Sequence, residues 1–272
     1  MATTVERTLN RIADGDFFLI AGPCVVESEA LCLEIADHIG ALADRFETPF
    51  VFKSSFTKAN RTSPDSYTGP GVDAGLTVLR KVKETARVPV LTDVHETTQV
   101  DPVAEVADIL QIPAFLSRQT ELIAKAGASG RWVNIKKGQF LAPEDMALAA
   151  EKAGSDKVML TERGSSFGYR NLVVDFRSLI IMSRTGRPVV FDATHSLQRP
   201  GAGDGVSTGQ PEFVIPMARA AVAVGVNGLF VETHPDPAKG LSDAGAMLPM
   251  ADMERLLSEV LAIRDARKHK SK

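Results

Sequence analysis

Short apolar runs alternate with amphipathic stretches along this chain. Eight runs rich in β-branched and aromatic residues predict strands, at residues 17–21, 50–53, 88–92, 108–111, 132–136, 157–160, 188–191 and 228–232. Between these runs, apolar residues recur three or four positions apart, as Leu31, Ile35 and Ile39 do, which predicts helices. Strands that alternate with helices in this way form parallel βα units.

Eight βα units within 272 residues favour a (β/α)8 barrel, the TIM-barrel fold, over an open doubly wound sheet. No linker rich in Pro, Gly or Ser divides the chain, so residues 1–272 are expected to form a single domain. Residues 1–16 precede the first unit, and we expect them to form an N-terminal extension over the bottom of the barrel. The Gly-rich loop 196–211 follows the seventh strand, and we expect a mobile lid there.

The overall composition is that of an ordinary globular protein. The net charge is -3 and the pI is about 6.0, so bulk charge does not favour binding to nucleic acid or to membranes. No apolar run reaches the roughly 18 residues that a membrane helix requires, and the N-terminus lacks a signal-peptide pattern. Cys24 and Cys32 do not suggest a disulfide framework, so we expect a cytoplasmic protein in a reducing compartment.

Side chains that can bind, titrate or ligate follow every predicted strand. In a (β/α)8 barrel the carboxyl ends of the strands carry the active site, because the loops there converge on one face. The side chains at these positions are Cys24, Lys53, Asp93, Gln111, Lys136, Arg163, His195 and Glu232. A chance sequence would leave several of these positions with only Gly, Ser or Asn, so the pattern predicts an enzyme.

One group of these side chains is cationic and comes from the loops after the second, fifth and sixth strands. Its members are Lys53, Lys58, Arg61, Lys136 and Arg163. Converging on one barrel mouth, they would repel one another unless polyanions lay between them. Two phosphorylated substrates, or a phosphate and a carboxylate, would suit the group, because Arg and Lys form strong hydrogen bonds to phosphate oxygens. For residues 50–62 alone, a solvated surface loop is an equally good interpretation.

A second group offers the ligand types of a borderline divalent metal. Cys24, His195, Glu232 and Asp243 supply a thiolate, an imidazole and two carboxylates, which suit Zn2+, Fe2+, Mn2+ or Co2+. Members of the group also have structural interpretations, Cys24 as a small buried residue and Asp243 as a local cap. Their long spacing matches no compact metal motif, so the residues alone leave the metal site open.

Several motifs at the strand ends match a known family in order. They are AGPC (21–24), VFKSSF (51–56), KANR (58–61), QIPAF (111–115), NIKKGQF (134–140), TERG (161–164), FGY (167–169), NLVVD (171–175), DATH (192–195) and ETHP (232–235). On these motifs the chain resembles the 3-deoxy-D-manno-octulosonate 8-phosphate synthases (Kdo8P synthases) over nearly its whole length. The resemblance implies that phosphoenolpyruvate, D-arabinose 5-phosphate and water are converted to 3-deoxy-D-manno-octulosonate 8-phosphate and inorganic phosphate, in the biosynthesis of Kdo and lipopolysaccharide.

The resemblance also implies roles for residues. Phosphoenolpyruvate is expected to bind Lys53, Lys58, Gln111, Lys136 and Arg163. The arabinose phosphate is expected to bind Asn60, Arg61 and Thr62, where Thr62 replaces the family's usual Ser and keeps its hydroxyl. The expected substrate-binding residues further include Ser54, Asp93, Ala114, Phe115 and His195. The candidate catalytic residues are His195, Lys136, Arg163 and Asp243.

Kdo8P synthases fall into a metal-dependent and a metal-independent class, which carry Cys or Asn, respectively, after the first strand. Cys24 therefore implies the metal-dependent class, with His195, Glu232 and Asp243 as the other ligands of a divalent Zn, Fe, Mn or Co ion. The resemblance also implies a homotetramer with active sites near the subunit interfaces.

Alternative functions stay open on the sequence. The related 3-deoxy-D-arabino-heptulosonate 7-phosphate synthases use erythrose 4-phosphate and share the barrel and the metal ligands. They typically read Lys-Pro-Arg-Thr where this chain has Lys58, Ala59, Asn60 and Arg61. The missing proline and the added Asn60 favour the five-carbon sugar. A metal-dependent aldolase acting on one sugar phosphate is a further alternative, but it would need fewer cations.

Overall fold

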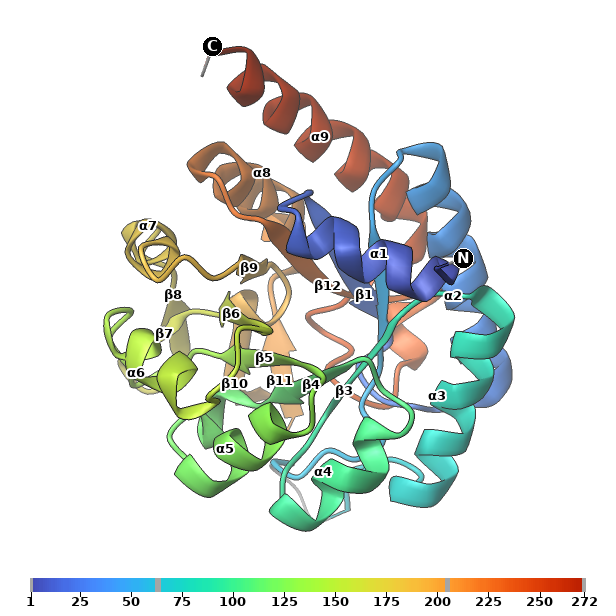
Figure 1. The fold of residues 1–272 in the computed structure, drawn as a ribbon. Helices are drawn as coiled ribbons and strands as arrows, with labels where there is room; N and C mark the ends of the chain where they lie inside the picture. The colour runs from blue at the N-terminus through green and yellow to red at the C-terminus, as the bar shows by residue number, and fades with distance from the viewer. Residues whose placement is uncertain (1, 62–64, 204–205, 271–272) are drawn as a thin grey trace.

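The structure is a computed structural model that describes residues 2–61, 65–203 and 206–270. Eight parallel strands form a closed barrel, because β1 (Phe18–Gly22) pairs with β2 (Phe50–Lys53) on one side and with β12 (Gly228–His234) on the other. The strands between them, in order around the barrel, are β3 (Val90–Asp93), β4 (Ile109–Ile112), β5 (Trp132–Lys136), β6 (Val158–Glu162) and β9 (Val189–Asp192). The predicted (β/α)8 fold is confirmed (Figure 1).

Helices follow the strands and surround the barrel (Figure 1). They are α2 (Glu29–Arg45), α3 (Val72–Ala86), α4 (Thr97–Ala104), α5 (Thr120–Ala128), α6 (Asp145–Lys152), α7 (Arg177–Ser183), α8 (Val214–Val224) and α9 (Met253–Lys270). In α2, the Ser28 side-chain oxygen accepts a hydrogen bond from the Leu31 backbone N–H and so caps the first turn. Within the described part of the chain, no helix is both long and apolar enough to cross a membrane.

A further helix, α1 (Thr4–Ala13), lies apart from this ring and covers the N-terminal end of the barrel (Figure 1). A capping box starts α1, in which Thr3 and Glu6 each accept a hydrogen bond from the backbone N–H of the other. Ile12 is 1% exposed and packs among the apolar side chains inside the barrel, such as Phe18 and Ile20. In the structure this helix covers the bottom of the barrel.

Alternate residues of each strand point into the barrel and out toward the helices. In β1, Phe18 and Ile20 belong to the cluster inside the barrel, whereas Leu19 and Ala21 pack in the shell between strands and helices. This alternation follows from the two-residue period of a strand. Both faces are apolar because both are buried, and the strands therefore read as continuous apolar runs in the sequence.

The interior of the barrel changes from apolar to polar toward the carboxyl ends of the strands. We call the apolar side chains that point into the barrel near its N-terminal end the lower layer. On six strands, two positions after a residue of this layer, a polar or charged side chain also points inward. The pairs are Val51 and Lys53, Leu91 and Asp93, Ile109 and Gln111, Met159 and Thr161, Val190 and Asp192, and Phe230 and Glu232. The polar members are 6% exposed or less. Each charge in this polar layer therefore needs a partner inside the protein.

Most strands end one or two residues later than the apolar runs predicted. The predicted runs 157–160 and 188–191 stopped at their last apolar residue, whereas the backbone pairing continues into the polar residues that follow. Asp93 pairs with Gln111 across β3 and β4, and Asp192 pairs with Phe230 across β9 and β12. The polar layer thus belongs to the rigid hydrogen-bonded ladder and not to the loops.

Two antiparallel hairpins follow barrel strands. β7 (Ser165–Phe167) pairs with β8 (Asn171–Val173), and β10 (Gln198–Gly203) pairs with β11 (Val206–Gly209). The expected loop 196–211 is thus largely a hairpin, apart from residues 204–205, which lie outside the described part of the chain. The sequence did not indicate it, because a Gly-rich segment can form ladder hydrogen bonds without an apolar pattern. Its mobility stays a prediction.

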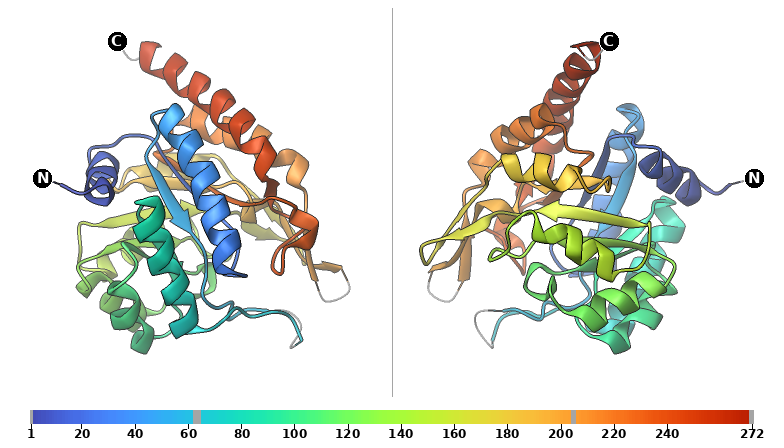
Figure 2. Two further views of the ribbon diagram at one scale, coloured as in Figure 1. Left: turned by 90° about the vertical axis from the view of Figure 1, so that its right-hand side faces the viewer. Right: turned by 60° about the vertical axis from the view of Figure 1, so that its left-hand side comes forward.

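The β10–β11 hairpin extends from the barrel on the side away from α1 (Figure 2). It therefore stands at the same end as the polar layer, where a ligand would enter. Short elements complete the fold, namely β13 (Leu248–Pro249) and the 3-10 helices η1 (Ala114–Leu116), η2 (His195–Leu197), η3 (Pro211–Phe213), η4 (Pro237–Lys239) and η5 (Met250–Asp252).

Gly75 in α3 permits close contact between this helix and the chain that follows β2. A Cβ added at Gly75 would lie 2.3 Å from the Cβ of Phe56, which is fully buried. We expect Gly75→Ala to lower the free energy of unfolding by about 1–3 kcal/mol, because it overpacks this contact. Gly40→Ala in α2 is the matched control, since no atom lies within 4 Å of a Cβ added there. Thermal unfolding measures both variants, and equal midpoints would contradict the prediction.

Candidate active site

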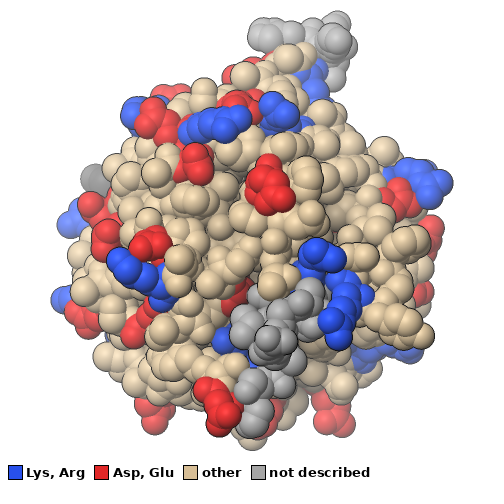
Figure 3. All heavy atoms as spheres, turned by 180° about the vertical axis from the view of Figure 1, so that it is seen from behind, with Lys and Arg blue, Asp and Glu red and all other residues tan. Residues whose placement is uncertain are grey.

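A cavity of about 330 Å³ opens at the carboxyl ends of the barrel strands. The predicted site residues that line it are Lys53, Lys58, Asn60, Asp93, Gln111, Ala114, Phe115, Lys136, Arg163 and His195. Figure 3 views the molecule from the side opposite to Figure 1, and Lys and Arg side chains gather there beside residues that are not described. Most of the predicted substrate-binding residues thus share one cavity.

A buried ion pair joins the cavity wall to the last barrel strand. Lys53 Nζ donates to Glu232 Oε1 at 2.6 Å and to the carbonyl oxygen of Cys24 at 3.0 Å. Burial alone would raise the pKa of Glu232, but His195, Lys53 and Lys58 outweigh burial and lower this pKa. Glu232 therefore stays ionised in the barrel interior, and its charge holds Lys53 in place.

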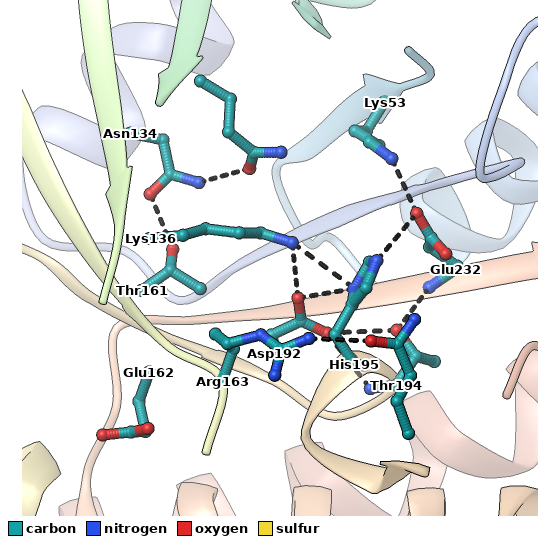
Figure 4. A network of polar contacts seen from close by, with 12 residues as sticks. Lys53, Asn134, Lys136, Thr161, Glu162, Arg163, Asp192, Thr194, His195 and Glu232 are labelled. Atoms are coloured by element: carbon teal, nitrogen blue, oxygen red, sulfur yellow. Dashed lines mark hydrogen bonds and ion pairs between the residues drawn. The ribbon is translucent and has the colours of Figure 1, made fainter. Parts of the chain in front are cut away.

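A second buried carboxylate, Asp192, holds both Lys136 and His195 (Figure 4). Asp192 Oδ2 lies 2.6 Å from Lys136 Nζ and 2.7 Å from His195 Nδ1. Its other oxygen accepts hydrogen bonds from the backbone N–H groups of Thr194 and His195. Burial lowers the pKa of Lys136, and repulsion by Lys53 adds to this effect, whereas Asp192 opposes it. Asp192 thus stabilises the charged form of Lys136.

The contact with Asp192 also fixes the tautomer of His195. Nδ1 donates to the carboxylate, so the other ring nitrogen, Nε2, offers a lone pair when the ring is neutral and carries a proton when the ring is charged. This Nε2 lies 3.4 Å from Glu232 Oε1. Two acceptors at this distance repel each other unless a proton or a metal ion lies between them. The geometry therefore suits a cation at this point.

Arg163 presents a donor without a partner. Its Nη2 donates to Gln198 Oε1 at 2.7 Å, which ties Arg163 to the base of the β10–β11 hairpin. Its Nη1 is buried and has no hydrogen-bond partner among the described residues. A buried guanidinium N–H without an acceptor is costly, so Arg163 is ready to bind an anionic ligand that enters the cavity.

Buried carboxylates offset part of the positive charge at the cavity. Lys58 Nζ lies 3.9 Å from Glu232 Oε1. Burial alone would lower the pKa of Lys58, but its electrostatic interactions with Cys24, Glu232 and Asp93 raise it. From the sequence we expected the cations to repel one another unless polyanionic ligands lay between them. That expectation is too strong, because the buried carboxylates of Asp93, Asp192 and Glu232 lie in the same polar layer as the cations and already reduce the repulsion.

Next to the cavity, three of the four predicted metal ligands come together. The ligand atoms of Cys24, Glu232 and Asp243 all lie within 4.8 Å of one another. Cys24 Sγ is 3.0 Å from Ser242 Oγ and 3.1 Å from Asp243 Oδ2. Burial raises the pKa of the Cys24 thiol, and the neighbouring carboxylates raise it further, so this thiol needs a cation to ionise. One thiolate and two carboxylates suit a borderline divalent metal.

The backbone at Asp243 is in the left-handed region, with a φ of 51°. Residues other than Gly seldom adopt this conformation, and Asp is one of the few that tolerate it. In this conformation the Asp243 carboxylate lies 3.1 Å from Cys24 Sγ. His195, the fourth predicted ligand, contacts Glu232 through Nε2 but does not belong to this compact group.

Two predicted binding residues within the described part of the chain, Ser54 and Arg61, do not line the cavity. Ser54 is fully buried, and its hydroxyl has no partner in the described part of the chain. Arg61 donates from Nη1 to Ser242 Oγ at 2.7 Å and from Nη2 to the Leu241 carbonyl at 3.1 Å, so it faces the loop before β13. Thr62 lies outside the described residues.

Some residues of the site were not among the predicted binding or catalytic residues. Asp192 follows the apolar run of its strand and begins the DATH motif (192–195), and these were its signals. Phe230, whose ring centroid is 3.9 Å from Lys136 Nζ, lies two positions before Glu232, so strand alternation could have identified it. His95 and Gln139 also line the cavity, and Gln139 lies in the NIKKGQF motif (134–140), although its place in the cavity depends on the folded loop.

The chain has close relatives among known proteins. Residues 4–268 match the sequence model of the DAHP synthetase I family. The chain is 56% identical over 253 residues to the 2-dehydro-3-deoxyphosphooctonate aldolase of Dichelobacter nodosus. This alignment covers 92% of this chain and 91% of the relative. It is 56% identical over 252 residues to the protein of the same name from Legionella pneumophila (strain Corby), covering 92% of each. It is also 56% identical over 259 residues to that of Cyanothece sp. (strain PCC 7425), covering 94% of this chain and 95% of the relative.

The charge of Asp192 is expected to be important for stability. Asp192→Asn keeps the shape of the side chain but leaves Lys136 without its buried counter-charge, so we expect a loss of about 3–5 kcal/mol in the free energy of unfolding. Asp156→Asn is the control, because Asp156 is a fully exposed partner of Arg187 and such surface pairs contribute about 0–1 kcal/mol. Urea unfolding measures both variants. A loss for Asp192→Asn as small as that of the control would contradict the prediction.

Proposed function

The chain belongs to the DAHP synthetase I family, and on this premise we propose that it joins phosphoenolpyruvate to D-arabinose 5-phosphate. The reaction consumes water and gives 3-deoxy-D-manno-octulosonate 8-phosphate and inorganic phosphate, on the way to Kdo and lipopolysaccharide. One observation carries this proposal. The chain is 56% identical, over 92% of its length, to relatives named 2-dehydro-3-deoxyphosphooctonate aldolase, another name for Kdo8P synthase.

The cavity offers donors for both anionic groups of phosphoenolpyruvate. Arg163 Nη1 and Lys136 Nζ would hold the phosphate, and Lys53, Lys58 and Gln111 would complete the contacts to this substrate. Lys136 and Lys53 are fixed by Asp192 and Glu232 before any substrate binds. Donors that are already oriented can stabilise the phosphate as negative charge moves onto it.

In the proposed reaction, C3 of phosphoenolpyruvate attacks the aldehyde carbon of the sugar, while water adds at C2. The tetrahedral intermediate then expels inorganic phosphate by breaking its bond between C2 and oxygen. The intermediate must be protected from bulk water. We propose that the β10–β11 hairpin closes over it, because Gln198 at the base of this hairpin is hydrogen-bonded to Arg163.

The choice of sugar is proposed to lie with Ala59 and Asn60. Both line the cavity, at the positions where synthases that use erythrose 4-phosphate typically have Pro and Arg. The amide of Asn60 can donate to and accept from hydroxyl groups of a five-carbon sugar. Arg61 would have to leave Leu241 and Ser242 to bind the sugar phosphate.

We further propose that Cys24, His195, Glu232 and Asp243 hold a divalent metal ion. The compact group of Cys24, Glu232 and Asp243 supports this, as does the facing pair of His195 Nε2 and Glu232 Oε1. When bound, the metal would supply Lewis-acid polarisation of the aldehyde or of the attacking water. The donor set suits Zn, Fe, Mn or Co and does not select among them.

We also propose that the chain forms a homotetramer with active sites near the subunit interfaces. Phe115 lines the cavity and yet is 55% exposed, and Phe140 and Phe167 are 58% and 68% exposed. A second copy would bury such large apolar side chains at the barrel mouth. The cytoplasmic location remains a prediction from the sequence.

Phosphate release tests the reaction. With phosphoenolpyruvate present, we expect D-arabinose 5-phosphate to support release about 100-fold faster, or more, than erythrose 4-phosphate, since a site with polar groups for one substrate rejects an analogue that leaves them unpaired. Phosphoenolpyruvate alone should release none. No turnover of the five-carbon sugar would contradict the proposal, and a preference for erythrose 4-phosphate would favour the heptulosonate reaction instead. Cleavage of a single sugar phosphate would favour an aldolase.

Metal removal tests the metal proposal. We expect a chelator to reduce the activity at least about tenfold, and added Zn, Fe, Mn or Co to restore it. Cys24→Asn is expected to lose the metal, as measured by elemental analysis, and to keep partial activity that the chelator does not affect.

The control for Cys24→Asn is Cys32→Ala, which removes the other buried thiol and is expected to keep the metal. Full activity of the original protein after complete metal removal would contradict the metal proposal alone. An inactive but folded Cys24→Asn protein would show that the metal is chemically essential.

A further inference from the structure

A chain of hydrogen-bonded side chains crosses four neighbouring strands at the floor of the cavity. Asp93 on β3 accepts from Gln111 Nε2 on β4 at 2.6 Å, and Gln111 Oε1 accepts from Asn134 Nδ2 on β5 at 2.8 Å. Asn134 Oδ1 in turn accepts from Thr161 Oγ1 on β6 at 2.6 Å. Figure 4 shows Asn134 and Thr161 joined beside Lys136. We call these four side chains the amide relay.

Asp93 fixes the direction of the amide relay. The Ser55 hydroxyl donates to one of its oxygens and Gln111 to the other. Burial alone would raise the pKa of Asp93, but Lys53 and Lys58 lower it, so Asp93 is a carboxylate and can only accept. Gln111 must then turn Nε2 toward Asp93 and Oε1 toward Asn134. The two amides could otherwise be reversed, since their oxygen and nitrogen atoms have the same shape.

The amide relay leaves one donor for a ligand. Gln111 Nε2 carries two protons, and only one of them bonds to Asp93. Gln111 lines the cavity, so its second N–H can reach an oxygen of a bound molecule. Asn134 and Thr161 are 0% exposed and do not line the cavity. They can therefore influence a ligand only through Gln111.

We propose that Asn134 and Thr161 are positioning residues that aim the free N–H of Gln111 at an anionic oxygen of phosphoenolpyruvate. This inference rests on the proposed function. Without the hydrogen bond from Thr161, Asn134 can turn over and no longer hold the oxygen of Gln111. Gln111 keeps its bond to Asp93 but loses the second contact that holds the plane of its amide, so its free N–H is no longer held in the direction of the substrate oxygen. The affinity for phosphoenolpyruvate should therefore fall while the affinity for the sugar phosphate should not, because no member of the amide relay belongs to residues 60–62, which are proposed to bind the sugar phosphate.

Thr161→Val removes the hydroxyl and keeps the β-branched shape. We expect the KM for phosphoenolpyruvate to rise about 3- to 10-fold, as for the loss of one hydrogen bond. The kcat and the KM for D-arabinose 5-phosphate should stay within about twofold of the original values. Thr161→Ser keeps the hydroxyl and is expected to restore the KM for phosphoenolpyruvate.

Thr92→Val is the matched control. Thr92 is also a fully buried threonine of a barrel strand, but its hydroxyl has no hydrogen-bond partner within the residues that the structure describes. We expect Thr92→Val to leave both KM values and kcat unchanged. A rise in the KM for phosphoenolpyruvate as large as that of Thr161→Val would overturn the inference, since it would trace the effect to a general change in packing.

A double-mutant cycle tests whether Thr161 acts through Gln111. In a Gln111→Met background, Thr161→Val is expected to cause no further rise in the KM for phosphoenolpyruvate. Additive effects, an unchanged KM in the single variant, or equal rises for both substrates would overturn the inference. Asn134→Leu is an independent route to the same change. If neither Thr161→Val nor Asn134→Leu folds, the two residues are structural and the inference fails.

The original protein is measured in the same assay. If it does not turn over phosphoenolpyruvate with D-arabinose 5-phosphate, the proposed function fails, and the inference fails with it for that separate reason. If it does, an unchanged KM in folded Thr161→Val overturns the inference and leaves the proposed function intact.

Discussion

The structure depends on pairing the lysine ammonium groups that are buried at the carboxyl ends of the barrel strands. Lys53 and Lys136 lie almost completely inside the protein, and each is 2.6 Å from a carboxylate, Glu232 or Asp192. An unpaired charge at this depth would strongly destabilise the fold, whereas a hydrogen-bonded pair is tolerated. The same pairs hold both ammonium groups in position before a substrate arrives. Folding and binding therefore impose the same requirement on these four side chains.

The apolar lower layer makes this arrangement possible. Side chains such as Phe18 and Ile20, covered from below by Ile12 of α1, fill the barrel so that ligands reach the polar layer only from the other end. Within that layer most charges already have partners, and Arg163 Nη1 is an exception among the described residues. This explains how a chain with a net charge of -3 offers a binding site for a polyanion. The positive charge is local, and its orientation is more important than its amount.

The strand positions and the chemistry at the strand ends could be predicted from the sequence, because an apolar run that ends in Lys53 or Lys136 indicates both a strand and a charged group at its end. The hydrogen-bond partners of these two lysines could not be predicted. Nothing near Lys136 in the sequence indicates that Asp192 is its partner, since β6 lies between β5 and β9 and the two side chains meet only because both point into the barrel. Asn134 is a polar residue within an apolar run, and only the register that sets it beside Gln111 reveals its hydrogen bond. Likewise, the bonds from Arg61 to Ser242 join loops that are far apart in the chain.

The central claim is that ion pairs in the polar layer fix the cations where the phosphate of phosphoenolpyruvate binds. A crystal structure of the complex with phosphoenolpyruvate tests this claim most directly. We expect the phosphate oxygens to lie within hydrogen-bond distance of Arg163 Nη1 and Lys136 Nζ, with the contact between Lys136 and Asp192 still intact. A phosphate bound outside this cavity, or a Lys136 that has turned away from Asp192 to reach it, would contradict the claim.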